Sequence, residues 1–217
     1  MKLYNSDLSP FASCVRLVIY AKGIESQVEI VAPPEGLKSA AYLALNPIGK
    51  VPALQVDGWV LPESTVICEF LDERFPEPGL RPSSAEERAR MRLLTRLVDL
   101  YLYPGLLVLF GQATPGDRAE ERITEGFRMI EHASTHLLYW FGDGSHAVGD
   151  RLTLADCSLV PALFYVRSLS RLFKRDPFGA HPKLGEYYHR VSEEAPAARV
   201  VAEMKAALAE RRNQQAR

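Results

Sequence analysis

The segment KVPALQVDGWVLPESTVICEFLDERF, residues 50–75, contains the clearest structural signals in the first third of the chain. Residues 53–56 and 59–61 are short runs of strand-forming side chains, and Asp57-Gly58 lies between them. That dipeptide readily takes the positive φ angles of a tight two-residue turn. Residues 64–75 then carry apolar side chains at helical spacing. The stretch therefore predicts a β-hairpin followed by a helix.

Between the amino terminus and this segment, the sequence pattern alternates between strand and helix. Residues 2–4 predict a short strand, and a helix follows with apolar side chains at helical spacing up to Lys22-Gly23, a pair that suits a helix end. Residues 27–30 alternate as in a half-buried strand, and residues 37–45 predict a short helix. With the hairpin and its helix, the predicted order is βαβαββα.

Towards the carboxyl terminus the chain changes character after a segment rich in proline. Residues 76–82 contain three prolines and a glycine, which exclude regular structure and indicate a linker. Beyond it the apolar period is helical throughout, which predicts an all-α part of at least five helices, with Pro104 and Gly105 kinking or ending the first of them. The fold class is therefore α/β plus all-α. The predicted division is a first domain over 1–78, a linker over 79–85 and a helical domain over 86–217.

Composition and charge exclude several classes of function. The 217 residues contain 26 Lys+Arg against 27 Asp+Glu. The sequence has no basic block interleaved with aromatic residues, so nucleic-acid binding is not expected. Because we find no signal peptide and no run of apolar length sufficient to cross a bilayer, we expect a cytoplasmic protein without membrane association.

Metal and disulfide chemistry are not expected either. The three cysteines, Cys14, Cys68 and Cys157, are far apart in sequence and have no metal-ligand spacing, so we expect reduced thiols. His132 and His136 have the i, i+4 spacing of a helical metal pair, but no third ligand can be identified, so no metal is predicted.

Three features would meet at one edge of the predicted sheet. Ser9-Pro10 begins the first helix, which places a hydroxyl and exposed amides at the positive end of the helix dipole. Val51-Pro52 precedes the hairpin, and a cis bond there would present the backbone of Val51 to an extended peptide. Glu63-Ser64 begins the next helix, whose amino terminus favours a carboxylate. Each feature alone is typical of an ordinary cap or loop, and their combination predicts a site.

A series of motifs adds a family resemblance. The motifs are Ser9-Pro10-Phe11, Val15-Arg16-Leu17, Lys22-Gly23, Lys38-Ser39, Asn46-Pro47, Lys50-Val51-Pro52-Ala53-Leu54, Glu63-Ser64 and Phe70-Leu71-Asp72-Glu73. In this order they resemble the glutathione-binding domain of cytosolic glutathione S-transferases, particularly the serine-type tau class of plants and its bacterial relatives. The resemblance implies a thioredoxin-like first domain. Gly149-Asp150 and Leu152-Thr153-Leu154-Ala155-Asp156 resemble the capping motif of the family's helical domain, in which Thr153 and Asp156 form a reciprocal box.

The resemblance implies a function and assigns residues to it. Glutathione is the expected co-substrate, and Ser9 is expected to activate its thiol for attack on a small electrophile. Val51 would pair with the cysteinyl backbone, Glu63 and Ser64 with the γ-glutamyl end, and two lysines with the glycyl carboxylate. The matching glutathione-binding positions are Lys38, Lys50, Val51, Pro52, Glu63 and Ser64. The electrophile is expected between the domains, beside Phe11 and a helix that carries Tyr101, Tyr103 and Leu106. A homodimer is implied, with Asp99 reaching towards the partner's ligand.

Several alternatives stay open within this resemblance. Cys14 departs from the arginine common in tau-type members, and a cysteine near a helix amino terminus can support glutathione-dependent thiol exchange. Ser13-Cys14 partly matches the motif of maleylacetoacetate-type isomerases. The segment 63–69 resembles bacterial members that cleave aryl ethers. A non-catalytic interaction protein of the same fold is the remaining alternative.

Overall fold

The computed structural model describes residues 1–114, 116, 118–176 and 178–215, and the chain forms two compact units. The first contains Met1–Leu80 and the chain from Ala195 onward, and the second contains Arg81–Glu194. The last helix, α9 (Ala195–Gln215), groups with the first unit because it packs against α1 (Pro10–Lys22). The predicted division into 1–78, 79–85 and 86–217 counted this helix with the others, and that division stays a prediction.

The first unit is built on a four-stranded mixed sheet in the order β2-β1-β3-β4. Its strands are β1 (Lys2–Tyr4), β2 (Glu29–Val31), β3 (Ala53–Val56) and β4 (Trp59–Pro62). Strand β1 pairs in parallel with β2 and antiparallel with β3, which places Leu3 opposite both Ile30 and Leu54. The β3–β4 turn has φ of 42° at Asp57 and 95° at Gly58, as the dipeptide predicted.

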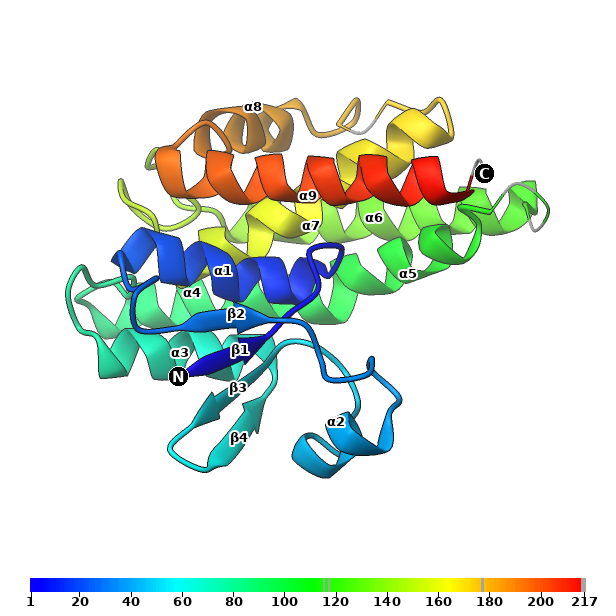
Figure 1. The fold of residues 1–217 in the computed structure, drawn as a ribbon. Helices are drawn as coiled ribbons and strands as arrows, with labels where there is room; N and C mark the ends of the chain where they lie inside the picture. Colours follow the sequence, from blue (N-terminus) through cyan, green and yellow to red (C-terminus); the bar gives the residue numbers. More distant parts are fainter. Residues whose placement is uncertain (115, 117, 177, 216–217) are drawn as a thin grey trace. The chain divides into compact units, whose positions relative to one another are not determined.

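Helices cover both sides of this sheet. Helices α1 and α3 (Ser64–Arg74) pack on each other, and α2 (Ala40–Leu45) lies on the opposite side of the strands from α1 (Figure 1). Leu17 of α1 and Ile67 and Leu71 of α3 are fully buried and form part of the core of the first unit. The predicted βαβαββα order and thioredoxin-like architecture are thus confirmed.

A buried ion pair holds the segment that leaves α3. The ammonium of Lys22 lies 2.7 Å from Asp72 Oδ1 and donates to the carbonyl oxygens of Phe75 and Pro78, each at 2.7 Å. The same carboxylate oxygen accepts the N–H of Leu80 at 2.9 Å. Because buried charges are tolerated only when they are paired and hydrogen-bonded, this network fixes the path of the chain to the end of the first unit.

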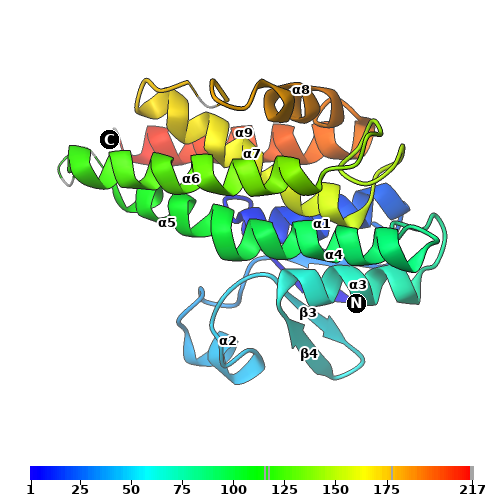
Figure 2. The same cartoon turned by 180° about the vertical axis from the view of Figure 1, so that it is seen from behind.

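The second unit is all helical, as predicted. Its elements are α4 (Ala85–Leu97), the π-helical turn η1 (Val98–Leu102), α5 (Tyr103–Gly111), α6 (Glu120–Trp140), α7 (Leu154–Leu172) and α8 (Pro182–Val191). Helix α6 runs alongside the consecutive elements α4, η1 and α5 (Figure 2). The sequence predicted that Pro104 and Gly105 kink or end the first helix, and the helix does not end there. A wider π turn precedes this proline and accommodates its missing N–H.

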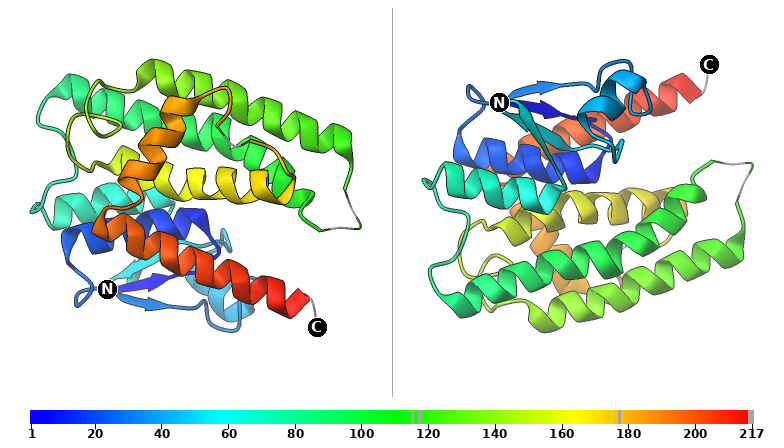
Figure 3. Two further views of the ribbon diagram at one scale, coloured as in Figure 1. Left: turned by 90° about the horizontal axis from the view of Figure 1, so that it is seen from above. Right: turned by 90° about the horizontal axis from the view of Figure 1, so that it is seen from below.

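The continuous helix Ala85–Gly111 corrects one expectation from the sequence. Its 27 residues include a window long and apolar enough to cross a membrane by length and composition, whereas no such run was expected. Half of that window is buried. The helix packs against α6 and α7, and the views in Figure 3 show α6 beside it from two further directions. It is a core helix of the second unit.

Helix α7 begins with the reciprocal capping box that the sequence predicted. Asp156 Oδ2 accepts the N–H and the hydroxyl of Thr153, both at 2.8 Å, while the Thr153 side chain caps the third helical amide. The other carboxylate oxygen accepts the N–H of Ala147 at 2.9 Å and the hydroxyl of Tyr187 at 2.7 Å. Asp156 is fully buried, so one carboxylate joins the loop before α7, the start of α7 and α8.

Candidate functional site

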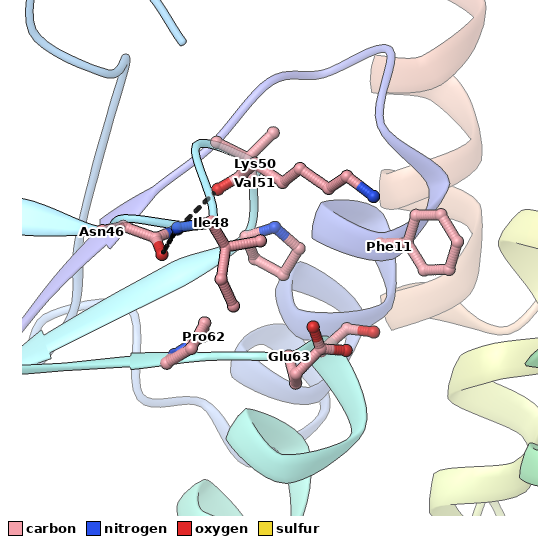
Figure 4. A pocket seen from close by; sticks show the side chains of 9 residues that line it. Phe11, Asn46, Ile48, Lys50, Val51, Pro62 and Glu63 are labelled. Atoms are coloured by element: carbon pink, nitrogen blue, oxygen red, sulfur yellow. Dashed lines mark hydrogen bonds between the residues drawn. The ribbon is translucent and has the colours of Figure 1, made fainter. Parts of the chain in front are cut away.

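An open hollow of about 120 Å³ lies in the first unit at the edge of the sheet. Three segments line it: the first turn of α1, the loop before β3, and the junction of β4 with α3 (Figure 4). The lining residues are Phe11, Asn46, Ile48, Lys50, Val51, Pro52, Pro62, Glu63 and Ser64. Five of the six predicted ligand contacts are therefore brought together here, namely Lys50, Val51, Pro52, Glu63 and Ser64.

The loop before β3 is held by two side chains that the sequence analysis did not assign. The carbonyl oxygen of Lys50 accepts the Tyr42 hydroxyl at 2.7 Å and the Asn46 amide at 2.9 Å. Asn46 Oδ1 also accepts the N–H of Ile48 at 3.2 Å. Tyr42 is fully buried, and this burial raises the pKa of its hydroxyl, which stays a donor. The Val51-Pro52 bond that follows is cis.

The two predicted lysines lie near Gly49, which has a left-handed backbone conformation. Gly49 has φ of +64°, and a Cβ there would lie 2.8 Å from Leu43 Cδ2 and 3.3 Å from Lys38 Nζ. Only glycine fits this close approach without strain. Lys38 is therefore near the loop of the hollow although it does not line it, and both lysine side chains are exposed. Exposed cations here form a positive rim that suits a carboxylate.

The junction of β4 with α3 has an uncommon backbone. Glu63 is the N-cap of α3 with φ of 72° and ψ of 112°, and its side chain makes no capping hydrogen bond. Ser64 is the first helical residue and is buried. A non-glycine residue with positive φ is uncommon and costs about 1–3 kcal/mol, and such strain clusters at ligand sites. The helix amino terminus thus opens into the hollow with amides available for an anion.

Ser9 lies at the amino terminus of α1, as predicted. Its Oγ accepts the N–H of Ala12 at 3.2 Å, which leaves the hydroxyl proton available for donation to another acceptor. Its carbonyl oxygen accepts both the N–H and the Oγ–H of Ser13, each at 2.9 Å. Ser9 itself does not line the hollow, whereas Phe11 in the same helical turn does.

Comparison with known proteins identifies the family. Residues 3–79 match a family model described as the N-terminal domain of glutathione S-transferase, and residues 116–190 match one described as its C-terminal domain. The chain belongs to the glutathione S-transferase family.

Curated relatives and a solved structure agree with this membership. A maleylacetoacetate isomerase of Pseudomonas aeruginosa is 36% identical over 173 residues, which cover 76% of this chain and 80% of the relative. A stringent starvation protein A homolog of Coxiella burnetii is 33% identical over 164 residues, 76% of this chain and 75% of the relative. The crystal structure of rice GST1 with glutathione has a TM-score of 0.79 at 27% identity and covers 91% of this chain and 88% of that one.

The predicted electrophile contacts of the second unit do not form one exposed surface. Tyr101 is 45% exposed and makes an edge-to-face contact with His136, with ring centroids 5.7 Å apart. Tyr103 is 4% exposed and Leu106 is fully buried, so both side chains pack inside the helical unit. Their spacing is that of a helix face directed at a core, which explains why the pattern alone did not separate packing from binding.

Cys14 is also a packing residue, which weakens the thiol-exchange alternative. Its side chain is 3% exposed, and its sulfur lies 3.5 Å from that of Cys68, which is 2% exposed. Cys157 is fully buried. His132 and His136 contact each other through Nε2 atoms 3.0 Å apart, but within the described ranges no group of three or more metal-ligating side chains forms.

The burial of the thiols predicts slow modification. We expect the three cysteines to react with an aromatic disulfide reagent at least about a hundredfold more slowly in the native protein than in denaturant, because reactive thiols are partly exposed. Stopped-flow absorbance of the released chromophore measures this. One thiol that reacts as fast as free cysteine would contradict the packing assignment and restore the exchange alternative.

Proposed function

We propose that this member of the family is a serine-type glutathione transferase, which binds glutathione in the hollow and ionises its thiol for attack on a small, hydrophobic electrophile. The observation that supports this most directly is the hollow itself. It combines the backbone at Val51 with the open amino terminus of α3, beside the helix capped by Ser9. An extended peptide with a carboxylate at each end matches this arrangement.

The charges of glutathione fit the residues around the hollow. The γ-glutamyl carboxylate is proposed to accept from Ser64 and the first amides of α3, and its ammonium to contact Glu63. Val51 pairs through its backbone with the cysteinyl residue. Lys38 and Lys50 face the glycyl carboxylate. Each proposed contact joins opposite charges or a donor with an acceptor.

Ionisation of the thiol is the chemical task in this proposal. A free thiol has a pKa of about 8.5, so little of it is thiolate at neutral pH. The Ser9 hydroxyl donates to the sulfur anion, and the dipole of α1 favours negative charge there. A hydrogen bond to a charged group contributes about 1.5–3 kcal/mol, or one to two pKa units. The thiol proton passes to solvent, and the sulfur then forms a bond to the electrophilic carbon as the leaving group departs from that carbon with its bonding electron pair.

Other parts of the assignment are proposals of the same kind. Of the residues predicted to contact the electrophile, Tyr101 is exposed and Phe11 is half-buried, so these two remain the candidates. Ether cleavage is the same attack with an aryl oxide as leaving group. We also propose a cytoplasmic homodimer in which Asp99 extends towards the partner's ligand. Detoxification is the proposed role.

A glutathione-dependent isomerase is the second candidate, favoured by the named relatives. In that reaction the thiolate adds to a carbon–carbon double bond and is expelled after rotation, so glutathione is returned unchanged. Ser13 and Cys14, which partly match the isomerase motif, are both buried, and the Ser13 hydroxyl is engaged by Ser9 and Arg16. A coupled assay distinguishes the candidates, since an isomerase consumes no glutathione and a transferase consumes one equivalent per turnover.

Replacing Ser64 by alanine tests the glutathione site. We expect the KM for glutathione to rise about tenfold, with weaker retention on immobilised glutathione, because one donor to the γ-glutamyl carboxylate is lost. Ser26→Ala is the matched control, since Ser26 is an exposed serine of the same unit that does not line the hollow. Equal retention of the Ser64 variant and the control would count against the site.

A further inference from the structure

A single buried arginine connects the loop before Ser9 with the last helix of the chain. The guanidinium of Arg16 lies in α1 with its side chain 2% exposed. One terminal nitrogen donates to Asp7 Oδ1 at 2.9 Å and to Glu203 Oε2 at 2.6 Å. The other nitrogen donates to Ser13 Oγ at 2.8 Å. Arg16 therefore touches the β1–α1 loop, the first turn of α1 and α9 at once.

The contacts of Arg16 continue directly to Ser9. The Ser13 hydroxyl accepts from Arg16 and donates to the carbonyl oxygen of Ser9 at 2.9 Å. On the other side, Asp7 stands two residues before Ser9 and receives the Asn5 side-chain amide at 2.8 Å as well as Arg16. The N-cap residue of α1 is thus held from both its preceding loop and its following turn. These bonds constrain the direction in which the Ser9 hydroxyl points.

Glu203 is itself held in place on α9. Its other carboxylate oxygen accepts the Tyr20 hydroxyl at 2.9 Å, and burial together with this carboxylate raises the pKa of Tyr20 to about 12. The guanidinium of Arg199 lies 3.7 Å from the Tyr20 ring centre and pairs with Glu25 at 2.9 Å. Glu203 is therefore a fixed partner for Arg16.

The buried charge of Arg16 needs the carboxylate of Glu203 nearby. An arginine remains charged in proteins, and a buried charge is tolerated only when acids and acceptors surround it. Arg16 Nε has no hydrogen-bond partner within the part of the chain that the structure describes, so its terminal nitrogens make all of its recorded bonds. Glu203 makes the shorter carboxylate contact and is less exposed than Asp7, 30% against 55%. Loss of Glu203 would leave Arg16 with only the more solvated acid.

We infer that Arg16 and Glu203 are positioning residues for Ser9, so that α9, at the far end of the sequence, sets the geometry of the thiol-activating hydroxyl. The catalytic part of this inference rests on the proposed transferase function. The structural part, that the Glu203 carboxylate orders the segment 6–13, does not. The hollow that is proposed to bind glutathione contains neither residue. The inference therefore separates thiol activation from glutathione binding.

Glu203→Gln in the full chain tests the inference, because it removes the charge and keeps the shape of the side chain. Glu210→Gln is the matched control, since Glu210 is exposed on the same helix and makes no ion pair that the structure records. We expect amide exchange over residues 6–13 to quicken about tenfold in the Glu203 variant alone. The pKa of bound glutathione should rise by about half to one unit, and kcat should fall about threefold to tenfold at neutral pH. The KM for glutathione should stay within about twofold.

A conservative variant, together with the separate changes in amide exchange, KM and thiol pKa, decides whether Glu203 positions Ser9. Glu203→Asp keeps the charge and should recover part of the thiol pKa and of kcat. Unchanged exchange over residues 6–13 would overturn the inference, and so would a rise in KM with an unaltered thiol pKa. If the native protein does not ionise glutathione, the proposed function fails, and the exchange measurement still decides whether Glu203 orders the loop.

Discussion

Replacing Ser9 by alanine should raise the pKa of bound glutathione by about one to two units and lower kcat at neutral pH by about 10- to 100-fold. The Ser9 hydroxyl is the donor that we assign to the sulfur anion, and the dipole of α1 alone gives only part of the stabilisation. The sign follows from the thiolate being the reactive form. A raised pKa reduces the thiolate fraction at neutral pH, and activity should recover as the pH rises through the new pKa. The pH dependence of kcat with a chlorinated dinitrobenzene measures this.

The control for this variant must account for the lost helix cap. The Ser9 side chain also caps α1, and such a cap contributes about 1 kcal/mol to stability. Ser84→Ala removes a cap with the same geometry, an Oγ that accepts from Glu87 N–H at 3.2 Å, and should leave kcat unchanged. Cys14→Ala should also leave conjugation nearly intact, because its thiol is buried. Activity lost with Cys14 and kept without Ser9 would transfer the chemistry to the cysteine.

Replacing Asp156 by alanine should lower the free energy of unfolding of the second unit by about 3–5 kcal/mol. The buried carboxylate accepts four hydrogen bonds, two from Thr153 and one each from Ala147 and Tyr187. The variant leaves these donors without an acceptor, and the cost of a buried unsatisfied group applies to each. Burial, with Asp156 nearby, also holds the pKa of Tyr187 well above its ordinary value, so its hydroxyl stays a donor.

Urea unfolding, monitored by hydrogen exchange, measures this loss in each unit separately. Separate measurement is needed because a chain of two units need not unfold in one step. Asp143→Ala is the control, since Asp143 is an exposed acid in the loop before α7. A loss below about 1 kcal/mol in the second unit would show that the network contributes no more than a surface hydrogen bond.

Local signals explain which parts of the fold could be predicted. The Asp57-Gly58 turn, the Ser9 cap and the Thr153–Asp156 box each depend on residues within four positions of one another, so they are readable from sequence. The packing of α9 on α1 joins residues far apart in the sequence, such as Arg16 and Glu203, which are 187 positions apart. That packing has no local sequence pattern. Pro104 did signal an irregularity in its helix, but not that it would take the form of a π turn over Val98–Leu102.

The site shows the same limit. Five predicted residues do line one hollow: Lys50, Val51, Pro52, Glu63 and Ser64. They could be predicted because the motifs that contain them follow one another in the order found in the family. Asn46, Ile48 and Pro62 were missed as lining residues, although Asn46 stands in a quoted motif and its amide holds the loop. Tyr103 and Leu106 were assigned to the ligand because aromatic and aliphatic side chains at helical spacing fit both a core and a pocket.

An ultraviolet difference titration of glutathione bound to the native protein measures thiol ionisation itself. Thiolate absorbance reports ionisation of the bound sulfur and requires no knowledge of the electrophile. We expect a half-ionisation point about one to two units below the value of about 8.5 for a free thiol, and a shift back towards that value in Ser9→Ala. Bound glutathione that titrates like the free tripeptide in the native protein would contradict this expectation.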